Sequence, residues 1–234
     1  MSFCTQIKHN GFAVVQELIP PDKLNWLCDQ ISLPGIRRSR AGVRHAFNLP
    51  QIVDFAQEEC LLDLAREILG TDAFAFHATL FDKSPQSNWL IVWHQDTALP
   101  LRERHEVAGW GPWSVKEGMH YAHAPAAALS RIVALRVHLD DSTVENGPIR
   151  FLPGTHTMGV LSDDSIHELS TKIAPVECAV PRGGVLAMRP LLVHASSKSG
   201  TGAPRRVLHI EYAVPTSIPH PLQLATPQNQ RQMG

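Results

Sequence analysis

The chain has 234 residues, of which 44% are hydrophobic and 18% are charged, and its formal net charge is −1. This length and apolar content suit one globular domain, and the near-zero charge provides no field that would attract nucleic acid or an anionic membrane. No run approaches the ~18 apolar residues that a membrane-spanning helix needs, and the N-terminus lacks the basic and apolar regions of a signal peptide.

The first third of the chain carries two helical patterns and the remainder reads as short strands. Apolar residues recur with helical spacing over 22–31 and over 51–69, and Gly70 ends the second pattern. Strand patterns follow at 74–81, 90–97, 132–139, 149–152, 185–188 and 207–214. Two leading helices followed by many short strands predict a mostly β fold, a double-stranded β-helix (the cupin-like jelly roll) with flanking N-terminal helices.

One segment between the strands, residues 98–130, is too long for a plain connection. It carries aromatic and basic side chains among glycines and prolines, namely Trp110, Trp113, Lys116, His120, Tyr121 and His123. It is either a flap that supplies substrate contacts or a surface excursion whose tryptophans pack on the barrel. We favour the flap, because the segment leaves directly from the strand at 90–97.

The domain organisation expected from these patterns is simple. A single domain spans 1–214, and residues 215–234, with four prolines and four glutamines, are expected to form a loose polar tail. The four cysteines are scattered and suit reduced thiols. A cytoplasmic protein fits these features, while the oligomeric state is left open.

The most informative motif is His94-Gln95-Asp96, followed far downstream by His194 and Arg205. Residues i and i+2 of a strand point the same way, so His94 and Asp96 project together if 90–97 is a strand. With His194 they would form the two-histidine, one-carboxylate ligand set of a non-haem Fe(II) site, which leaves the opposite face of the metal open. Arg205 adds a fixed cation that could hold the far carboxylate of a bound organic acid.

A plainer interpretation of these residues is also open. His94 could be an ordinary hydrogen-bonded histidine, Asp96 a turn cap, and His194 a satisfied side chain at a strand end. The chain contains thirteen histidines, so a chance H-x-D match is easily met. The ordered set of strand, H-x-D, further strands, distal histidine and arginine is what favours the metal site.

Longer stretches strengthen that prediction. They include Trp93-His94-Gln95-Asp96-Thr97, Pro190-Leu191-Leu192-Val193-His194-Ala195-Ser196-Ser197, and segments at 10–15, 20–22, 139–141, 145–148 and 152–156. Together they resemble the phytanoyl-CoA dioxygenase family of Fe(II)/2-oxoglutarate-dependent oxygenases over about residues 10–214. Arg205 lies eleven positions after His194, where that family places its 2-oxoglutarate arginine.

The resemblance implies further residues and a reaction. Thr79, Ser196 and Arg136 fall where relatives place side chains beside 2-oxoglutarate, although each could instead be a strand residue without a ligand. Arg136 and His138 share one strand face. A polar cluster of Arg44, His45 and Asn48 either approaches the pocket or only faces solvent.

The implied activity is hydroxylation of a small molecule by an Fe(II) enzyme that consumes 2-oxoglutarate and O₂ and releases succinate. Asp96 favours hydroxylation, or an outcome derived from it such as desaturation, because related halogenases have a small residue at that position. Two alternatives are a metal-dependent barrel enzyme that does not use 2-oxoglutarate and a catalytically idle binding module. The substrate itself does not follow from the sequence.

Overall fold

A computed structural model of the chain describes residues 1–33, 36, 38–39, 42–84 and 87–227. Its helices are α1 (Phe3–Asn10), α2 (Pro21–Ile31), α3 (Pro50–Phe55), α4 (Glu59–Leu69), α5 (Ala126–Leu129) and α6 (Asp163–Lys172). Its strands are β1 (Phe12–Val15), β2 (Gly42–Val43), β3 (Phe74–Lys83), β4 (Ile91–His94), β5 (Ala98–Leu101), β6 (Trp113–Lys116), β7 (Met119–His123), β8 (Ile132–His138), β9 (Ile149–Phe151), β10 (Val176–Cys178), β11 (Val185–Met188), β12 (His194–Ser196) and β13 (Arg205–Ala213).

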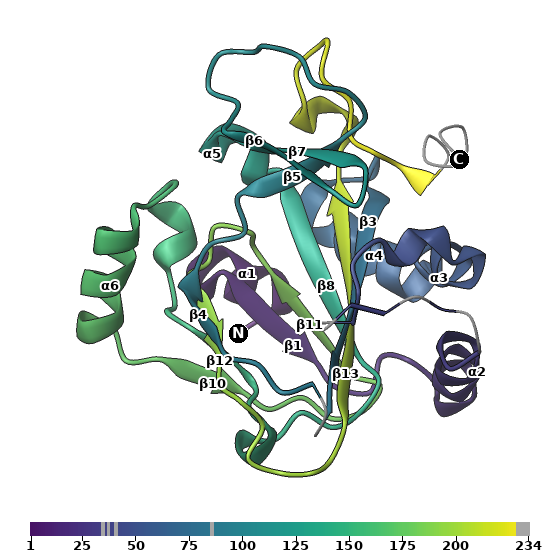
Figure 1. The fold of residues 1–234 in the computed structure, drawn as a ribbon. Coiled ribbons are helices and arrows are strands. Elements are labelled where there is room, and N and C mark those ends of the chain that lie inside the picture. Colours follow the sequence, from purple (N-terminus) through teal and green to yellow (C-terminus); the bar gives the residue numbers. More distant parts are fainter. Residues whose placement is uncertain (34–35, 37, 40–41, 85–86, 228–234) are drawn as a thin grey trace.

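Two antiparallel sheets form the centre of the molecule (Figure 1). The larger has the order β1-β11-β8-β13-β3-β2 and the smaller the order β10-β9-β12-β4. Side chains from both sheets line one shared cavity, so the sheets face each other. This is the double-stranded β-helix expected from the strand pattern, and the predicted fold class is confirmed.

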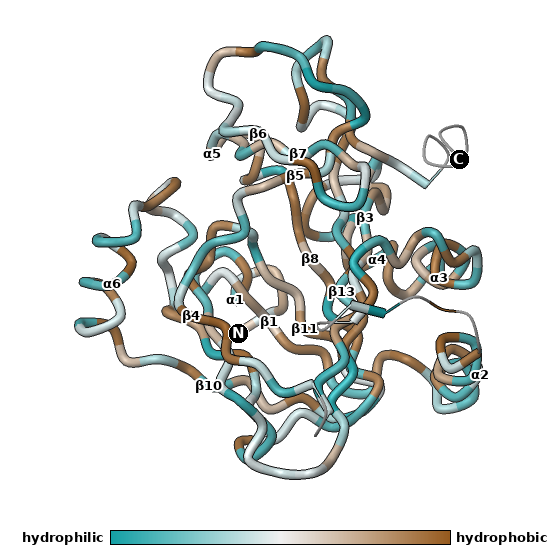
Figure 2. Tube along the Cα trace, in the orientation of Figure 1, coloured by the Kyte–Doolittle hydropathy of each residue, from teal (hydrophilic) through white to brown (hydrophobic). Residues whose placement is uncertain are grey.

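The main hydrophobic core lies between the larger sheet and the helices α1 to α4. On β8 the alternate residues Val133, Leu135 and Val137 face this core, and Figure 2 shows β8 as hydrophobic along most of its length. Arg136 and His138 lie on the other face of β8, and Arg136 lines the cavity. Because strand side chains alternate, packing one face against helices commits the other face to the barrel interior.

Several predicted elements differ in detail from the observed ones. The single helix expected over 51–69 is two helices, because the amides of Ala56, Gln57 and Glu58 bond to carbonyls two to four residues back and the chain turns before α4 begins. The strand expected over 90–97 ends at His94. The helix α1 was not predicted from its periodicity; Ser2 caps its start by accepting a hydrogen bond from the Thr5 amide.

A separate three-stranded sheet, β5-β7-β6, forms the upper lobe in Figure 1. Leu99 and Leu101 of β5 are buried in one cluster with Trp110 and with Leu222 and Leu224 from the C-terminal segment. Residues 215–227 therefore do not form the loose tail that their composition suggests; they pack on the lobe, with a bridge between Leu101 and Leu224. The remainder of that expected tail, 228–234, lies outside the described residues, and the boundary at 214 stays a prediction.

One negative finding concerns membranes. In the described ranges, none of the helices has both the length and the apolar character needed to cross a bilayer.

Candidate active site

The two distant histidines meet because their strands pair. β12 runs antiparallel to β4, and in this register His194 lies directly opposite His94. The two imidazole centroids are 4.2 Å apart. Asp96 lies 3.5 Å from both rings, with Oδ1 near His94 Nε2 and Oδ2 near His194 Nε2.

Asp96 lies beyond the end of β4, so strand alternation alone does not explain its direction. Its amide donates to the carbonyl of Pro190 at 2.9 Å. Between the two ligand candidates, the buried Gln95 amide donates to the carbonyls of Gly159 and Leu191, and its oxygen accepts from the Leu161 amide. These bonds fix the side chain of Gln95 between His94 and Asp96.

The hydrogen bonds of the imidazoles fit a metal centre. Nδ1 of His94 lies 2.8 Å from the carbonyl of Val92, and Nδ1 of His194 lies 2.8 Å from that of Leu192. An Nδ1–H donated to a carbonyl leaves Nε2 as the free lone pair, which is the usual orientation of a metal-ligating histidine. Each imidazole Nε2 lies 3.5 Å from an Asp96 oxygen, near the about 3 Å expected between neighbouring ligands about 2.1 Å from a metal, and the three donor atoms all lie within 4.8 Å of one another. His94, Asp96 and His194 could therefore hold a divalent ion.

Electrostatics within this group are consistent with a ligand set. Burial alone would raise the pKa of Asp96, but the nearby His194 and His94 hold it well below its usual range, so the carboxylate stays charged. Burial lowers the pKa of His194 to about 4, which keeps that imidazole neutral near pH 7. Burial also acts to lower the pKa of His94, yet its contact with Asp96 gives a net increase.

Three buried cations lie deeper in the same cavity. Arg205 is 5% exposed, Lys83 1% and Arg136 8%. Lys83 Nζ donates to Ser196 Oγ at 2.7 Å, and Arg205 Nη2 is 3.4 Å from the same oxygen. Burial together with the charges of Arg205 and Arg136 lowers the pKa of Lys83 to about 7; burial lowers the pKa of both arginines to about 10.

These cations have no acidic partner among the residues that the structure describes. In the part of the chain that the structure describes, no ion pair involves Lys83, Arg136 or Arg205, and the Nε atoms of both arginines are buried without a hydrogen-bond partner. Unpaired buried charge is costly. The arrangement therefore suits a ligand that brings more than one negative charge.

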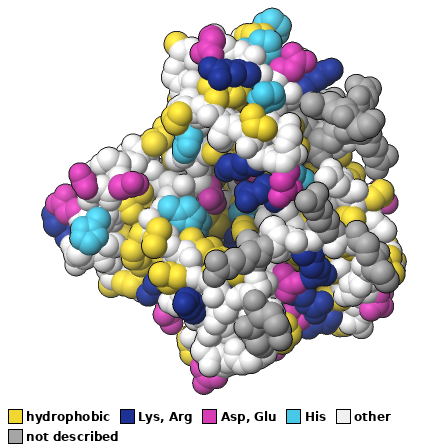
Figure 3. All heavy atoms as spheres, viewed as in Figure 1, with side chains coloured by type: hydrophobic (Ala, Val, Ile, Leu, Met, Phe, Trp, Pro, Cys, Tyr) yellow, Lys and Arg dark blue, Asp and Glu magenta, His cyan; other side chains and the backbone are white. Residues whose placement is uncertain are grey.

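The cavity that joins these groups has a volume of about 330 Å³. The carboxylate of the metal group and the guanidinium of Arg205 are both on its wall, as are residues of the 98–130 segment. Figure 3 shows cationic, acidic and histidine side chains gathered around a hollow near the middle of one face. Because the cavity is at the small end of ligand pockets in proteins, it suits small ligands.

Three other predicted site residues, Thr79, Ser196 and Arg136, also line this cavity, and each has its own hydrogen-bond partners. Thr79 lines it, but its hydroxyl donates to the carbonyl of Arg44 at 3.0 Å. Ser196 bridges Lys83 and Arg205, and Arg136 Nη1 donates to His209 Nδ1 at 2.9 Å. His138 is buried but does not line the cavity. Their roles toward a co-substrate stay predictions.

The 98–130 segment contributes both to the cavity wall and to the packing of the lobe, and its role as a flap that supplies substrate contacts stays a prediction. Lys116, Tyr121 and His123 line the cavity, while Trp110 and Trp113 pack in the lobe. From the polar cluster near residue 45, Arg44 reaches the cavity and His45 is buried against Lys116, whose carbonyl lies 3.2 Å from its Nε2.

Sequence reasoning missed four cavity residues, Lys83, His77, His209 and Glu211. A signal for them exists. On β3 the residues His77, Thr79, Phe81 and Lys83 alternate with the core residues Ala78 and Leu80, and on β13 Arg205, His209 and Glu211 alternate with Leu208 and Ile210. Charged residues at alternate positions of otherwise apolar strands share one face, which is either solvated or, in a closed barrel, lines an interior that can bind a polar ligand.

Comparison with known proteins identifies relatives. The family model for phytanoyl-CoA dioxygenase (PhyH) matches residues 7–207. L-proline trans-4-hydroxylase from Streptomyces griseoviridis is 28% identical over 190 residues, which cover 70% of this chain and 63% of the relative. The chain thus spans less than two thirds of that relative's length.

Solved structures share the fold at lower identity. AviO1 from Streptomyces viridochromogenes is similar with a TM-score of 0.66 and 22% identity, covering 94% of this chain and 96% of that one. EctD from S. alaskensis, solved with 2-oxoglutarate and 5-hydroxyectoine, has a TM-score of 0.68 and 19% identity, covering 90% and 74%. Because the family model extends over most of the chain, the protein belongs to the phytanoyl-CoA dioxygenase (PhyH) family.

Proposed function

We propose that the protein is an Fe(II)- and 2-oxoglutarate-dependent dioxygenase that hydroxylates a C–H bond of a small molecule. The observation that carries the proposal is the meeting, in one small cavity, of a two-histidine, one-carboxylate group and three buried cations that have no acidic partner among the described residues. The two histidines and the carboxylate suit Fe(II) with open coordination positions. The three cations suit a dicarboxylate.

In this proposal the chain's own residues have distinct tasks. His94, Asp96 and His194 hold the metal, and the Nδ1 contacts with backbone carbonyls fix both ring orientations. Arg205 binds the distal carboxylate of 2-oxoglutarate, Ser196 and Lys83 support it, and Arg136 and Thr79 lie beside it. Low exposure strengthens each of these charged contacts.

The bound iron supplies the redox chemistry, in which 2-oxoglutarate, O₂ and R–H give succinate, CO₂ and R–OH. Two of the similar proteins support this: one is a proline hydroxylase, and EctD was solved with 2-oxoglutarate. They support a small-molecule substrate as well. A metal enzyme that ignores 2-oxoglutarate is less favoured, because it would leave the buried cations without a counter-charge.

The test uses the purified protein with Fe(II), O₂ and 2-oxoglutarate, and measures succinate. Wild-type protein should form succinate, slowly without its substrate. Arg205→Ala should weaken 2-oxoglutarate binding about tenfold to a hundredfold, since it loses a charge-assisted contact, while iron binding is retained. His94→Ala should lose iron.

Two results would contradict the proposal. Equal affinity of wild type and Arg205→Ala for 2-oxoglutarate would refute the role of the arginine. Stoichiometric iron in His94→Ala would refute that histidine as a ligand.

A further inference from the structure

One wall of the cavity carries charged side chains that neither the metal group nor the three deep cations involve. The cationic part consists of Lys116 at the tip of the β6–β7 hairpin and Arg44. The acidic part is Glu211. Its carboxylate contacts His77, and His77 in turn contacts the Tyr121 hydroxyl. We refer to Lys116, Arg44, Glu211, His77 and Tyr121 together as the outer wall of the cavity.

Lys116 is the more informative of the two cations. Its Nζ lies 4.7 Å from the centre of the Tyr121 ring, and among the described residues no carboxylate forms an ion pair with it. Among the ion pairs of the described residues, Arg44 has one contact, at 3.9 Å with Glu117, whose side chain is 57% exposed. An exposed pair at that distance contributes little. Two cations therefore face the mouth of the cavity with most of their binding capacity unused.

The acidic part has an oxygen to spare. His77 Nδ1 lies 2.8 Å from one oxygen of Glu211, and the Tyr121 hydroxyl lies 3.3 Å from His77 Nε2. This pattern orients the imidazole with Nδ1–H toward the carboxylate. Within the described ranges the other Glu211 oxygen has no hydrogen-bond partner, although the side chain is only 12% exposed and lines the cavity. A carboxylate held in this way can accept a cationic donor from a ligand.

The size of the cavity limits what fits between these two ends. Its volume of about 330 Å³ must hold 2-oxoglutarate as well as the reacting part of the substrate. Since pockets for drug-sized ligands extend to about 1,000 Å³, only a small substrate can be enclosed. A nucleotide-bearing thioester would have to leave most of its mass outside.

We propose that the substrate is a small zwitterionic amino acid, whose carboxylate is bound by Lys116 with Arg44 and whose ammonium group is bound by Glu211. This inference rests on the proposed function, because it assigns the remaining part of the same cavity to the molecule that is oxidised. Tyr121 and His77 are positioning residues, since they hold Lys116 and Glu211 respectively.

The first experiment measures binding to the protein loaded with Ni(II), a redox-inert substitute for iron, and 2-oxoglutarate. The probes are the twenty common L-amino acids, L-pipecolic acid and β-alanine, each followed by its carboxamide and its N-acetyl derivative, and calorimetry gives each affinity. At least one amino acid should bind, and both of its derivatives should bind at least about tenfold more weakly, because each loses one charge-assisted contact.

Variants of Lys116 and Glu211 then test which residue binds the carboxylate and which binds the ammonium group of the amino acid. Lys116→Met, which keeps the aliphatic stem, should weaken the bound amino acid about tenfold to a hundredfold, and Lys116→Arg should restore most of that loss. Glu211→Gln should act similarly but reduce the discrimination against the N-acetyl derivative. Lys172→Met is the matched control, since Lys172 is an exposed lysine on α6 remote from the cavity lining.

The outcomes separate this inference from the proposed function. If 2-oxoglutarate fails to bind to the metal-loaded protein, the proposed function fails. If 2-oxoglutarate binds but no amino acid does, or if the carboxamide binds as well as the acid, the inference is overturned while the proposed function stands. Unchanged affinity in Lys116→Met would also overturn it.

Discussion

At the scale of single residues, the notable feature is an excess of buried positive charge. Lys83, Arg136 and Arg205 come from three different strands and share one cavity. Removing a cation from water costs free energy unless an anion compensates. Binding a dianion offsets that cost, so these residues give up stability in the free protein in return for affinity.

The titration of Lys83 makes the link between buried charge and affinity for a dianion measurable. Its pKa is about 7 in the free protein because of burial and the charges of Arg205 and Arg136. A bound dianion favours the charged amine, so the pKa of Lys83 rises on binding, and above pH 7 binding takes up a proton. The affinity for 2-oxoglutarate should therefore fall as pH rises, by up to about tenfold per unit between about pH 7 and 9.

The control for that measurement is Lys83→Met, which should bind 2-oxoglutarate more weakly but with little dependence on pH over this range. The two arginines stay charged there, because their pKa values are about 10. Calorimetric titrations at several pH values provide the comparison. The same slope in wild type and variant would exclude Lys83 as the titrating group.

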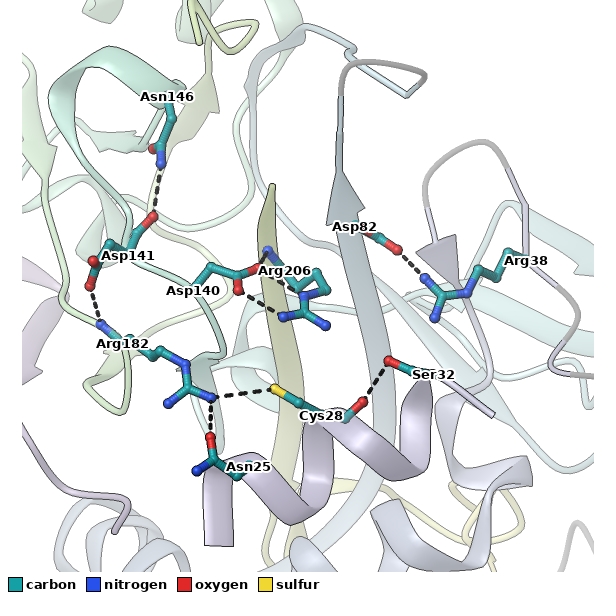
Figure 4. Close-up of polar contacts among 10 residues, drawn as sticks. All are labelled: Asn25, Cys28, Ser32, Arg38, Asp82, Asp140, Asp141, Asn146, Arg182 and Arg206. Atoms are coloured by element: carbon teal, nitrogen blue, oxygen red, sulfur yellow. Dashed lines mark hydrogen bonds and ion pairs between the residues drawn. The ribbon is translucent and has the colours of Figure 1, made fainter. Parts of the chain in front are cut away.

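At the scale of elements, alternation along β13 separates two neighbouring arginines. Arg205 points into the cavity, whereas Arg206 points outward and pairs with Asp140 through Nε and Nη2 at 2.9 and 2.8 Å (Figure 4). The Arg206 amide donates to the same carboxylate at 2.8 Å. The pair holds the start of β13 to the end of β8, so one arginine is structural and its neighbour is available for a ligand.

Exchanging each arginine for alanine should separate these roles. Arg206→Ala should lower the free energy of unfolding by about 2 kcal/mol, the usual contribution of charged hydrogen bonds, and leave the affinity for 2-oxoglutarate within twofold of wild type. Arg205→Ala should show the reverse pattern. Urea denaturation and calorimetry measure the two quantities, and a loss of 2-oxoglutarate affinity in Arg206→Ala would contradict the assignment of the two faces.

At the scale of the whole molecule, the lobe of β5, β6 and β7 is held by chain segments far apart in sequence. Leu222 and Leu224, which follow the last strand of the barrel, are buried with Leu99 and Leu101. The same lobe presents Lys116 and Tyr121 to the cavity. The C-terminal segment therefore supports the part of the outer wall that carries Lys116 and Tyr121.

Leu224→Ala tests this support. Leu224 is 6% exposed, and removing a buried leucine side chain typically costs about 2–4 kcal/mol. The free energy of unfolding should fall by that amount, measured by urea denaturation. Leu33→Ala is the matched control, because Leu33 is 49% exposed and should change stability little. Equal effects of the two substitutions would show that the C-terminal segment does not stabilise the lobe.

The sequence alone was sufficient for the fold class and for the central residues of the candidate site. The order of the H-x-D motif, the distal histidine and the arginine, together with the family resemblance, singled out His94, Asp96, His194 and Arg205, and the structure brings all four to one cavity. Local periodicity was enough to assign the faces of the strands, because the hydrophobic pattern of each strand decides which of its faces is buried against the helices. It did not explain the direction of Asp96, which lies beyond the end of β4.

Only the tertiary structure decided which inward-facing side chains meet. The pairing of β3 with β13 places Lys83 beside Arg205 and His77 beside Glu211, although each pair is more than a hundred residues apart in the chain. The burial of Leu224 and the contact of Thr79 with the Arg44 carbonyl arise in the same way. A local pattern records the face of a strand but not the identity or register of its neighbour, which depends on how the sheets and helices pack together.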